Sequence, residues 1–520
     1  MKKLKNALKF FKYLLLLVGA FILALSFYIK LGYDVASFEQ LLYTIMNAEG
    51  TGMDSIKGGI APVTIGTILF FALFMVPMYT KKLSRKVFLK ISIKKKKFLL
   101  PISYASRKLP YCIAVFILSI LIALWNFDFY RYITNQFQYS TIYEDYYVDP
   151  KTADIKFPTK KQNLIYIYVE SLEMTNASKA NGGDQTTSYI PQLERLALDN
   201  VNFSNQLKLG GATQVNGTGW TVAGMIAQTS GINMKVDING NNYSGFSSFL
   251  VGVTNLGDIL KENGYQNHIL MGSDAKFGGR DEMFSQHGDY EILDLIEARN
   301  SGKIPYDYMT WWGYEDAKLF DYAKEKLKTI SKSDEPFNLT MLTADTHFQD
   351  GFVEEGCESK FDKQYADVFY CSDSMIAEFV DWVQKQDFAK DTTIIIAGDH
   401  LSMQRNFYDD NDGYPRTVYN AIINPRVQPV REKDRMFTSM DMFPTTLAAL
   451  GAEIKGDRLA LGTNLFSGRD TLLEELGFEQ LDGELSRRST FYNNTLLGDS
   501  YYEMKKRLDG GDKSLLEEHP

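Results

Sequence analysis

Histidine and cysteine are scarce in this sequence, and an overall excess of basic charge is lacking. The chain has 520 residues but only five histidines, too few and too scattered for the His-rich pair of sites of a two-zinc phosphatase. It has three cysteines, and no internal repeat or low-complexity block is present. The net charge of −8 excludes a generally basic protein that coats nucleic acid, so we expect no nucleic-acid partner.

Long apolar runs, in contrast, are present in the first quarter of the chain. Residues 13–29, 58–80 and 109–127 carry no charge, and each is long enough to cross a bilayer, whose core needs about 20 residues of helix. A cleaved signal peptide is the alternative for the first run, but no convincing small-residue cleavage site follows before Lys30. We therefore expect about three transmembrane helices.

Basic residues predict the orientation of these helices. Lys2, Lys3 and Lys5 precede the first run, and eleven Lys and Arg residues lie in 81–108 between the second and third. The positive-inside rule places both groups in the cytoplasm. The sequence therefore predicts a multi-pass protein of the inner (cytoplasmic) membrane, with everything after Asp128 outside the cytoplasm.

The rest of the chain has the pattern of an α/β fold. Four short apolar runs without helical period, 164–169, 267–271, 337–343 and 392–397, are typical of strands buried on both faces. Helical patterns alternate with them, at 255–263, 315–330 and 372–386. This alternation predicts a mostly parallel sheet flanked by helices.

We expect four regions along the chain. Residues 1–127 form the membrane region, and 128–162, which begin rich in Tyr and Phe, form an interfacial stalk or linker. Residues 163–482 form the extracytoplasmic domain. Residues 483–520, which are short of apolar runs, form a C-terminal appendage with a frayed end.

The cysteines divide between the two compartments. Cys112 lies in the third apolar run, whereas Cys357 and Cys371 lie in the exported part. An oxidising compartment favours a disulfide between these two, although two unrelated buried thiols are the alternative.

Each predicted strand is followed at once by residues that are able to do chemistry. In an open α/β sheet, ligands bind beyond the carboxyl ends of the strands, so these four segments should converge. They are Glu170 and Ser171, Asp274 with Arg280, Asp345 to His347, and Asp399 with His400.

Three of these side chains predict a metal site. A carboxylate and an imidazole from Asp399 and His400, joined by Glu170 from another strand end, suit a divalent ion such as Mn²⁺, Mg²⁺ or Zn²⁺. Taken alone, an Asp-His pair is more often a turn or capping pair. Glu170 alone could be a carboxylate that neutralises a helix start.

A candidate nucleophile lies in the glycine-rich run 210–225. Thr218 stands between two glycines, before a predicted short helix at 220–227. A threonine at a helix start is usually an N-cap, but the same helix end attracts phosphate, and a bound metal would favour the alkoxide. We therefore predict Thr218 as nucleophile and as a fourth metal ligand. Its rivals are Thr213 and Thr221.

Arg280 and His347 complete the candidate site. The planar guanidinium of arginine matches phosphate oxygens. His347 could bind the substrate or protonate a leaving oxygen. The alternatives are a surface salt bridge for Arg280 and a hydrogen-bonded loop histidine for His347.

Five motifs together resemble a known family: Val169-Glu-Ser-Leu-Glu173, Gly217 to Met225, Thr346-His347, Gly398-Asp-His400 and Ser439 to Thr445. Between about 147 and 465 the chain is similar to phosphoglycerol transferases of the alkaline phosphatase/sulfatase superfamily, which include lipoteichoic acid synthase. The Gly-Thr-Gly-Trp-Thr run and the Cys357/Cys371 pair resemble more closely the enzymes that decorate periplasmic glucans.

The resemblance implies an alkaline phosphatase-like fold and one catalytic ion, commonly Mn²⁺, on Glu170, Thr218, Asp399 and His400. It implies Arg280 and His347 as catalytic residues at the substrate headgroup. One departure is that lipoteichoic acid synthases carry a tryptophan shortly before that arginine, where this chain has Phe277-Gly-Gly.

The implied reaction is a ping-pong transfer through a phospho-threonine-type covalent intermediate. Glycerol phosphate passes from the lipid donor phosphatidylglycerol to a glycan or polymer acceptor outside the cytoplasm. A phosphoethanolamine transferase is the nearest alternative. A sulfatase would need a Cys/Ser-x-Pro-x-Arg run, which is absent. A non-enzymatic alternative is a catalytically inactive surface scaffold.

Overall fold

The computed structural model describes residues 2–32, 38–46, 54–79, 88–93, 96–101, 109–236, 249–404, 407–408 and 413–498. The chain divides into two compact units. The first comprises Met1–Phe38 and Met53–Ile133, and the second comprises Glu39–Gly52 and Thr134–Pro520. The short segment between the first two apolar helices therefore belongs to the second unit.

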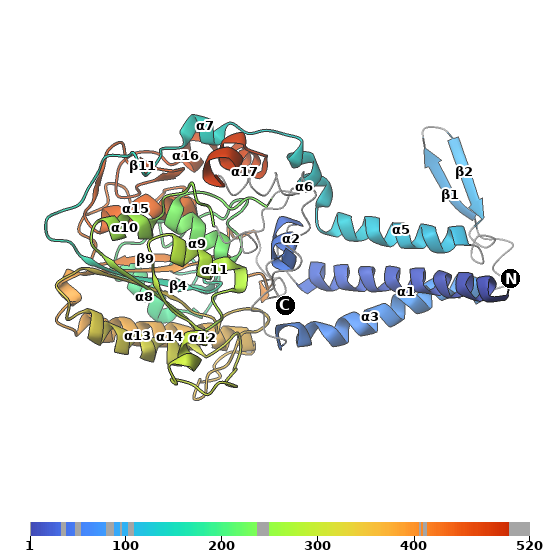
Figure 1. Ribbon diagram of the computed structural model, residues 1–520, viewed down its shortest axis with the longest axis horizontal. Coiled ribbons are helices and arrows are strands. Elements are labelled where there is room, and N and C mark those ends of the chain that lie inside the picture. Colours follow the sequence, from blue (N-terminus) through green and yellow to red (C-terminus); the bar gives the residue numbers. More distant parts are fainter. Residues whose placement is uncertain are drawn as a thin grey trace. The chain divides into compact units, whose positions relative to one another are not determined.

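The first unit is built on three apolar helices, α1 (Lys2–Gly32), α3 (Asp54–Tyr79) and α5 (Leu109–Asn126). Helix α1 packs against both of the others (Figure 1). All three are long and apolar enough to cross a membrane, over Asn6–Gly32, Gly59–Met78 and Leu109–Asn126. Large side chains of α3 such as Ile68 and Leu73 are exposed, as expected for a surface that faces lipid.

A hairpin and the predicted orientation complete this unit. Strands β1 (Phe88–Ile93) and β2 (Lys96–Pro101) pair antiparallel. They lie within the basic stretch 81–108, of which 81–87, 94–95 and 102–108 are outside the described residues. The number of crossings and the cytoplasmic side stay predictions.

The second unit contains a six-stranded sheet in the order β6-β5-β7-β4-β8-β9. The first five strands in this order are parallel, and β9 runs antiparallel to β8. This confirms the predicted fold class, and the predicted strand runs coincide with four of the strands. The bounds are β4 (Asn163–Val169), β5 (Gln266–Met271), β6 (Glu291–Leu293), β7 (Phe337–Leu342), β8 (Thr392–Gly398) and β9 (Asn420–Ile423).

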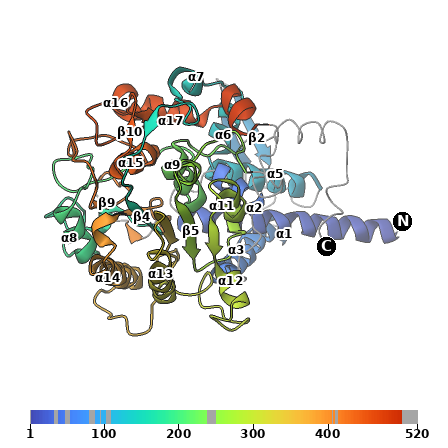
Figure 2. The ribbon, with the colours of Figure 1, turned by 60° about the vertical axis from the view of Figure 1, so that its left-hand side comes forward.

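Helices cover both faces of this sheet (Figure 1 and Figure 2). Tyr166 and Tyr168 of β4 share one core with α9 (Thr221–Ser230), α10 (Leu256–Glu262) and α15 (Met442–Ala449). Ile165 and Ile167 of β4 share the other with α8 (Pro191–Asp199), α13 (Asp316–Ile330) and α14 (Gln364–Gln384). Because β4 is buried on both faces, its sequence is an uninterrupted apolar run.

Helix α14 begins eight positions before the predicted start at Ser372. The Ser372-Asp373 pair resembles a helix start, but Asp373 caps a different helix. Its carboxylate accepts hydrogen bonds from the backbone N–H groups of Gln192 (3.0 Å) and Leu193 (2.6 Å) in the first turn of α8. Asp373 is therefore a helix-capping residue, but it caps α8, and the prediction that it begins α14 was wrong.

Parts of the expected stalk and appendage fold onto the main core. Tyr143 of α7 (Ile142–Tyr146) is buried and donates to Asn233 Oδ1 at 2.7 Å. Leu481 of α17 (Phe478–Ser486) and Tyr492 are also buried. The boundaries predicted at 127/128, 162/163 and 482/483 stay predictions, and the expected frayed end at 509–512 lies outside the described residues.

The remaining elements are short helices and strands. They are α2 (Phe38–Met46), α6 (Phe129–Gln136), β3 (Ile155–Lys156), η2 (Met174–Asn176), η3 (Phe277–Gly279), α11 (Arg280–Gln286), α12 (Leu295–Asn300), η4 (Ala389–Asp391), η6 (Ser439–Asp441), β10 (Glu453–Ile454), β11 (Arg458–Leu459), β12 (Gly462–Thr463), α16 (Leu472–Leu476) and η7 (Tyr492–Leu496).

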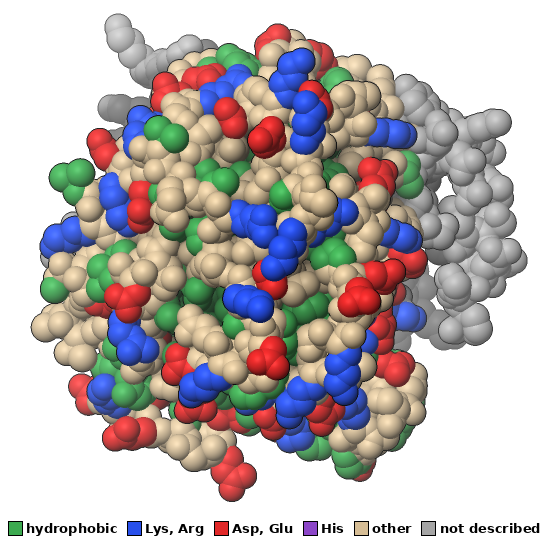
Figure 3. All heavy atoms as spheres, turned by 90° about the vertical axis from the view of Figure 1, so that its left-hand side faces the viewer, with side chains coloured by type: hydrophobic (Ala, Val, Ile, Leu, Met, Phe, Trp, Pro, Cys, Tyr) green, Lys and Arg blue, Asp and Glu red, His purple; other side chains and the backbone are tan. Residues whose placement is uncertain are grey.

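The surface of the second unit carries mixed charge. On the face drawn in Figure 3, basic and acidic side chains are interspersed. Ion pairs of this unit include Lys261 with Asp289 at 2.7 Å and Arg431 with Glu474 at 2.6 Å. Exposed pairs of this kind contribute about 0–1 kcal/mol each, so the buried cores dominate the stability.

A disulfide joins Cys357 to Cys371, with the Cα atoms 5.8 Å apart. It ties the loop that follows β7 to the first half of α14. The closed loop spans a sequence separation of 14, and Cys112 stays free and buried in α5.

Removing this disulfide is expected to destabilise the second unit. In the Cys357→Ser/Cys371→Ser variant the free energy of unfolding should fall by about 3 kcal/mol, because the unfolded chain regains the freedom of the loop. Urea unfolding of the purified protein measures the change. Dithiothreitol should lower the wild-type midpoint and leave that of the variant unchanged. An equal response of both proteins would contradict a stabilising role.

Candidate functional site

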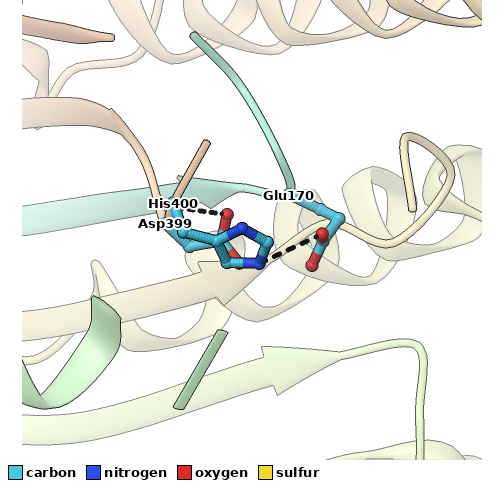
Figure 4. A group of neighbouring side chains, drawn as sticks. All are labelled: Glu170, Asp399 and His400. Atoms are coloured by element: carbon cyan, nitrogen blue, oxygen red, sulfur yellow. Dashed lines mark hydrogen bonds and ion pairs between the residues drawn. The ribbon is translucent and has the colours of Figure 1, made fainter. Parts of the chain in front are cut away.

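Three side chains from two adjacent strand ends form what we call the Glu170 cluster: Glu170, Asp399 and His400 (Figure 4). Glu170 follows β4, and Asp399 and His400 follow the neighbouring β8. One ligand atom from each residue lies within 4.8 Å of the others, and all three side chains are buried. The parallel pairing of the two strands thus brings together residues that are far apart in the sequence.

The backbone at the end of β4 is shaped for this cluster. Ser171 has a φ of 56°, a left-handed conformation that costs free energy for a residue other than glycine. In this conformation its N–H donates to Asp399 Oδ1 at 2.8 Å, and its hydroxyl donates to Glu170 Oε1 at 2.7 Å. The strained residue therefore fixes both carboxylates.

The arrangement of donors fits a cation. His400 Nδ1 is 2.8 Å from the carbonyl of Leu401, so Nδ1 carries the proton and the lone pair of Nε2 faces the carboxylates. Nε2 lies 3.5 Å from Glu170 Oε1 and 3.4 Å from Asp399 Oδ2. Asp399 Oδ2 is buried without a hydrogen-bond partner. Two carboxylates and an imidazole are a suitable ligand set for a divalent transition metal.

The pKa shifts of the three side chains also favour a cation at the Glu170 cluster. Burial raises the pKa of Asp399 to about 8, and the neighbouring Glu170 carboxylate adds to this effect. Burial also opposes ionisation of Glu170, but His400 and His347 outweigh it, so the pKa of Glu170 is lowered. Burial disfavours the charged form of His400, yet the two carboxylates raise its pKa. The cluster therefore needs positive charge, which a cation or a proton can supply.

Besides the Ser171 hydroxyl, that of Thr221, the first residue of α9, lies at this cluster. Thr221 Oγ1 donates to Glu170 Oε2 at 3.2 Å and lies 3.5 Å from His400 Nε2. Thr218 Oγ1 instead donates to the carbonyl of Val215 at 2.8 Å and accepts from its N–H at 3.1 Å. Of the two threonines, Thr221 thus has its hydroxyl at the Glu170 cluster, whereas the hydroxyl of Thr218, the predicted nucleophile and fourth ligand, is bound to the backbone of Val215.

A close backbone contact holds α9 against the end of β8. A Cβ atom at Gly224, one turn after Thr221, would lie 2.0 Å from the carbonyl oxygen of Asp399. Only glycine permits this approach. The first turn of α9 is thereby held at the Glu170 cluster, where its free N–H groups and dipole favour an anion.

His347 and Arg280 lie near the cluster, as their electrostatic influence on Glu170 indicates. His347 Nδ1 is 2.6 Å from the carbonyl of Phe348, and burial lowers the pKa of the ring. The neutral ring therefore presents Nε2 as an acceptor. Arg280 is buried; its Nε and Nη2 donate to the carbonyls of Phe277 (2.9 Å) and Asp274 (2.7 Å). The surface salt bridge considered for Arg280 is not formed among the described residues.

Trp312 is a candidate that the sequence did not indicate. Its ring lies 4.4 Å from that of His347 and 5.5 Å from that of Phe277, centroid to centroid. A β-bridge between Ser273 and Gly313 brings its loop to the site. A tryptophan is thus present beside His347 although none stands shortly before Arg280 in the sequence, and only the tertiary contact reveals it.

A second layer of charged residues supports the site. Glu173 is buried and lies three residues after Glu170. Its carboxylate accepts two hydrogen bonds of 2.8 Å from the Arg416 guanidinium. The same guanidinium donates to the carbonyl of Ser402 at 2.7 Å, just beyond His400. This ion pair ties together the two loops that carry the Glu170 cluster.

Comparisons with known proteins show the family of this chain. The sulfatase family profile matches residues 162–452, more than half of the chain. The chain is 31% identical over 380 residues to phosphoglycerol transferase I of Escherichia coli O127:H6 (strain E2348/69 / EPEC), covering 70% of this chain and 47% of that protein. It is 32% identical over 333 residues to phosphoglycerol transferase I of Salmonella choleraesuis (strain SC-B67), covering 62% and 41%.

The chain spans less than half the length of these curated relatives. Among solved structures, the lipoteichoic acid synthase LtaP from Listeria monocytogenes is 17% identical, with a TM-score of 0.48, covering 61% of this chain and 79% of that chain. The region matched by the family profile contains the whole six-stranded sheet and every residue of the Glu170 cluster. We conclude that the chain belongs to the sulfatase family.

Proposed function

We propose that this chain transfers glycerol phosphate from phosphatidylglycerol to a glycan or polymer acceptor outside the cytoplasm, with Thr221 as the covalent nucleophile. The observation that carries the proposal is the position of the Thr221 hydroxyl, 3.2 Å from Glu170 within the buried Glu170 cluster. Similarity to two phosphoglycerol transferases supports this choice of transferred group.

Glu170, Asp399 and His400 would hold one divalent cation, for which Mn²⁺ is the first candidate and Mg²⁺ or Zn²⁺ the others. When bound, such a cation supplies Lewis-acid chemistry that favours the ionised form of a nearby hydroxyl. The ligand atoms of this cluster fit a cation, since Asp399 Oδ2 has no hydrogen-bond partner among the described residues and lies 3.4 Å from His400 Nε2, whose lone pair is free to bind.

In the first half-reaction, Thr221 Oγ1 attacks the phosphorus of the lipid phosphodiester. The hydroxyl proton passes to Glu170 Oε2, which already accepts a hydrogen bond from it. The new Oγ1–P bond forms as the bond from phosphorus to the diacylglycerol oxygen breaks, and that oxygen takes up the proton from Glu170. In the second half-reaction an acceptor hydroxyl attacks the same phosphorus and its proton passes to Glu170. The Oγ1–P bond breaks, and Glu170 returns the proton to Thr221 Oγ1.

Arg280 and the first turn of α9 would bind the phosphate oxygens. The described hydrogen bonds of Arg280 use Nε and Nη2, and among the described residues none is made by Nη1. His347 suits a hydrogen bond from a glycerol hydroxyl better than protonation of a leaving oxygen, because burial lowers its pKa and keeps it neutral. Trp312 would cover the apolar side of the bound glycerol.

Apolar helices α1, α3 and α5 would anchor the chain in the inner membrane as a multi-pass protein. A lipid donor is confined to the same membrane, so anchoring raises its effective concentration at a tethered site. This agreement between anchor and donor supports a lipid, rather than a soluble ester, as the source of the phosphoryl group.

Donor choice tests the proposal. Purified full-length protein with Mn²⁺ is incubated in mixed micelles with phosphatidylglycerol or phosphatidylethanolamine, each labelled in the headgroup and in the acyl chains. We expect labelled diacylglycerol and headgroup label on the protein with phosphatidylglycerol, at a rate at least about tenfold above that with phosphatidylethanolamine.

A preference for phosphatidylethanolamine would identify a phosphoethanolamine transferase instead. Release of diacylglycerol with no label on the protein and none on an added glycan would indicate a hydrolase. If neither lipid is consumed with any of the three metals, the transferase proposal fails and an inactive scaffold becomes the better description.

A further inference from the structure

Helix α2 lies in the sequence between the apolar helices α1 and α3, but it packs with the second unit. Tyr43 of α2 is 4% exposed, and its hydroxyl donates to the carbonyl of Gly278 at 2.6 Å. Its ring lies 5.7 Å from that of Trp220, the N-cap residue of α9. One side chain of α2 therefore contacts both the turn before Arg280 and the start of the helix that carries Thr221.

The turn at Gly278 is closely fitted between these neighbours. Gly278 has a φ of +73°, and a Cβ atom added there would lie 2.7 Å from Val222 of α9 and 3.6 Å from the Tyr43 hydroxyl. The preceding carbonyl, that of Phe277, accepts from Arg280 Nε. The hydrogen bond from Tyr43 thus holds the carbonyl of Gly278, which lies in the turn between Phe277 and Arg280.

A second residue of α2 contacts the loop beyond the Glu170 cluster. Gln40 Nε2 lies 2.7 Å from the sulfur of Met403, three residues after His400. Helix α2 therefore contacts both the Phe277–Arg280 turn and the loop that follows β8. None of the residues that α2 contacts here belongs to a strand of the six-stranded sheet.

We propose that α2 is a wall of the substrate site and that Tyr43 is a positioning residue, which sets the Arg280 guanidinium for the phosphate group of the substrate. The inference rests on the proposed function for the role of Arg280 as a phosphate ligand. It goes further in making the segment between two apolar helices a part of that site. Burial raises the pKa of Tyr43, so the hydroxyl stays a donor at every working pH.

Binding of sn-glycerol 3-phosphate to full-length protein in detergent micelles tests the proposal by calorimetry. Tyr43→Phe removes only the hydroxyl, and we expect a dissociation constant about fivefold higher, as for the loss of one hydrogen bond. Tyr43→Ala also removes the ring and should exceed this effect. Thr44→Ala is the matched control, because Thr44 is exposed and, among the residues that the structure describes, its hydroxyl bonds only within α2, to the carbonyl of Gln40.

The profile across pH separates positioning from a general loss of structure. The ratio of dissociation constants for Tyr43→Phe and wild type should stay constant between about pH 6 and 9, since a tyrosine hydroxyl does not ionise there. A Tyr43→Phe protein that melts lower but binds as tightly as wild type would overturn the proposal. Failure of the wild type to bind glycerol phosphate would overturn it as well, by removing Arg280 as the ligand.

This experiment is independent of the donor assay. If phosphatidylglycerol is not consumed but Tyr43→Phe weakens glycerol phosphate binding, the positioning role stands and the transferase proposal fails. If the lipid is consumed and both proteins bind equally, the transferase proposal stands and the role of α2 fails.

Discussion

Thr221→Ala is expected to abolish transfer, with a loss of at least about a thousandfold in kcat, because no covalent intermediate can form without the attacking hydroxyl. Single-turnover incubation with headgroup-labelled phosphatidylglycerol measures both label on the protein and diacylglycerol released. The variant should fold normally, since Thr221 Oγ1 contacts only Glu170 and His400 among the described residues.

Thr218→Ala is the matched control, three residues earlier in the same segment. It removes two hydrogen bonds to the backbone of Val215 and should cost about 1–3 kcal/mol of stability. Its kcat should stay within about tenfold of wild type, because the Thr221 hydroxyl is still in place. Full activity of Thr221→Ala together with an inactive Thr218→Ala would return the nucleophile to the position first predicted from the sequence.

Asp399→Asn is expected to have the second large effect, through loss of the bound cation. The substitution keeps the shape but removes one of two carboxylates, so metal content should fall from about one Mn²⁺ per chain to near zero after dialysis, and kcat should fall by at least about a hundredfold. Elemental analysis and the donor assay measure the two quantities.

Thermal unfolding adds a readout that does not depend on turnover. Cation binding at a hundred times its dissociation constant stabilises the wild type by about 2.7 kcal/mol, so a chelator should lower its Tm. Asp399→Asn should not respond. Asp373→Asn is the matched control, another buried carboxylate whose pKa burial raises to about 7, but one that caps α8. Retention of metal by Asp399→Asn would contradict the assigned ligand set.

The strands could be predicted because their burial is recorded in their composition. β4 and β8 are covered by helices on both faces, which demands continuous apolar runs that local sequence reveals. The convergence of Glu170, Asp399 and His400 then followed from the polarity of a parallel sheet alone. Helix boundaries were less predictable, since Asp373 acts on α8 and not on the helix that contains it.

The choice of threonine required the structure. Two glycines around Thr218 suggested freedom to approach a ligand, whereas α9 starts at Thr221, right after the Trp220 N-cap. The predicted helix start at 220 was within one residue of the observed one, so the start of α9 did not by itself separate the two threonines. The tertiary contact of the Thr221 hydroxyl with Glu170 did. The contacts of Tyr43 and Trp312 depend on loops far apart in the chain, so no local pattern could have indicated them.

The close approach of Gly224 to the Asp399 carbonyl fixes the distance between α9, which begins at Thr221, and the end of β8, which Asp399 follows. Main chain meets main chain there, so no rotamer change can absorb even one added methyl group. The spacing of the Thr221 hydroxyl from the carboxylates of Glu170 and Asp399 is therefore closed to gradual adjustment.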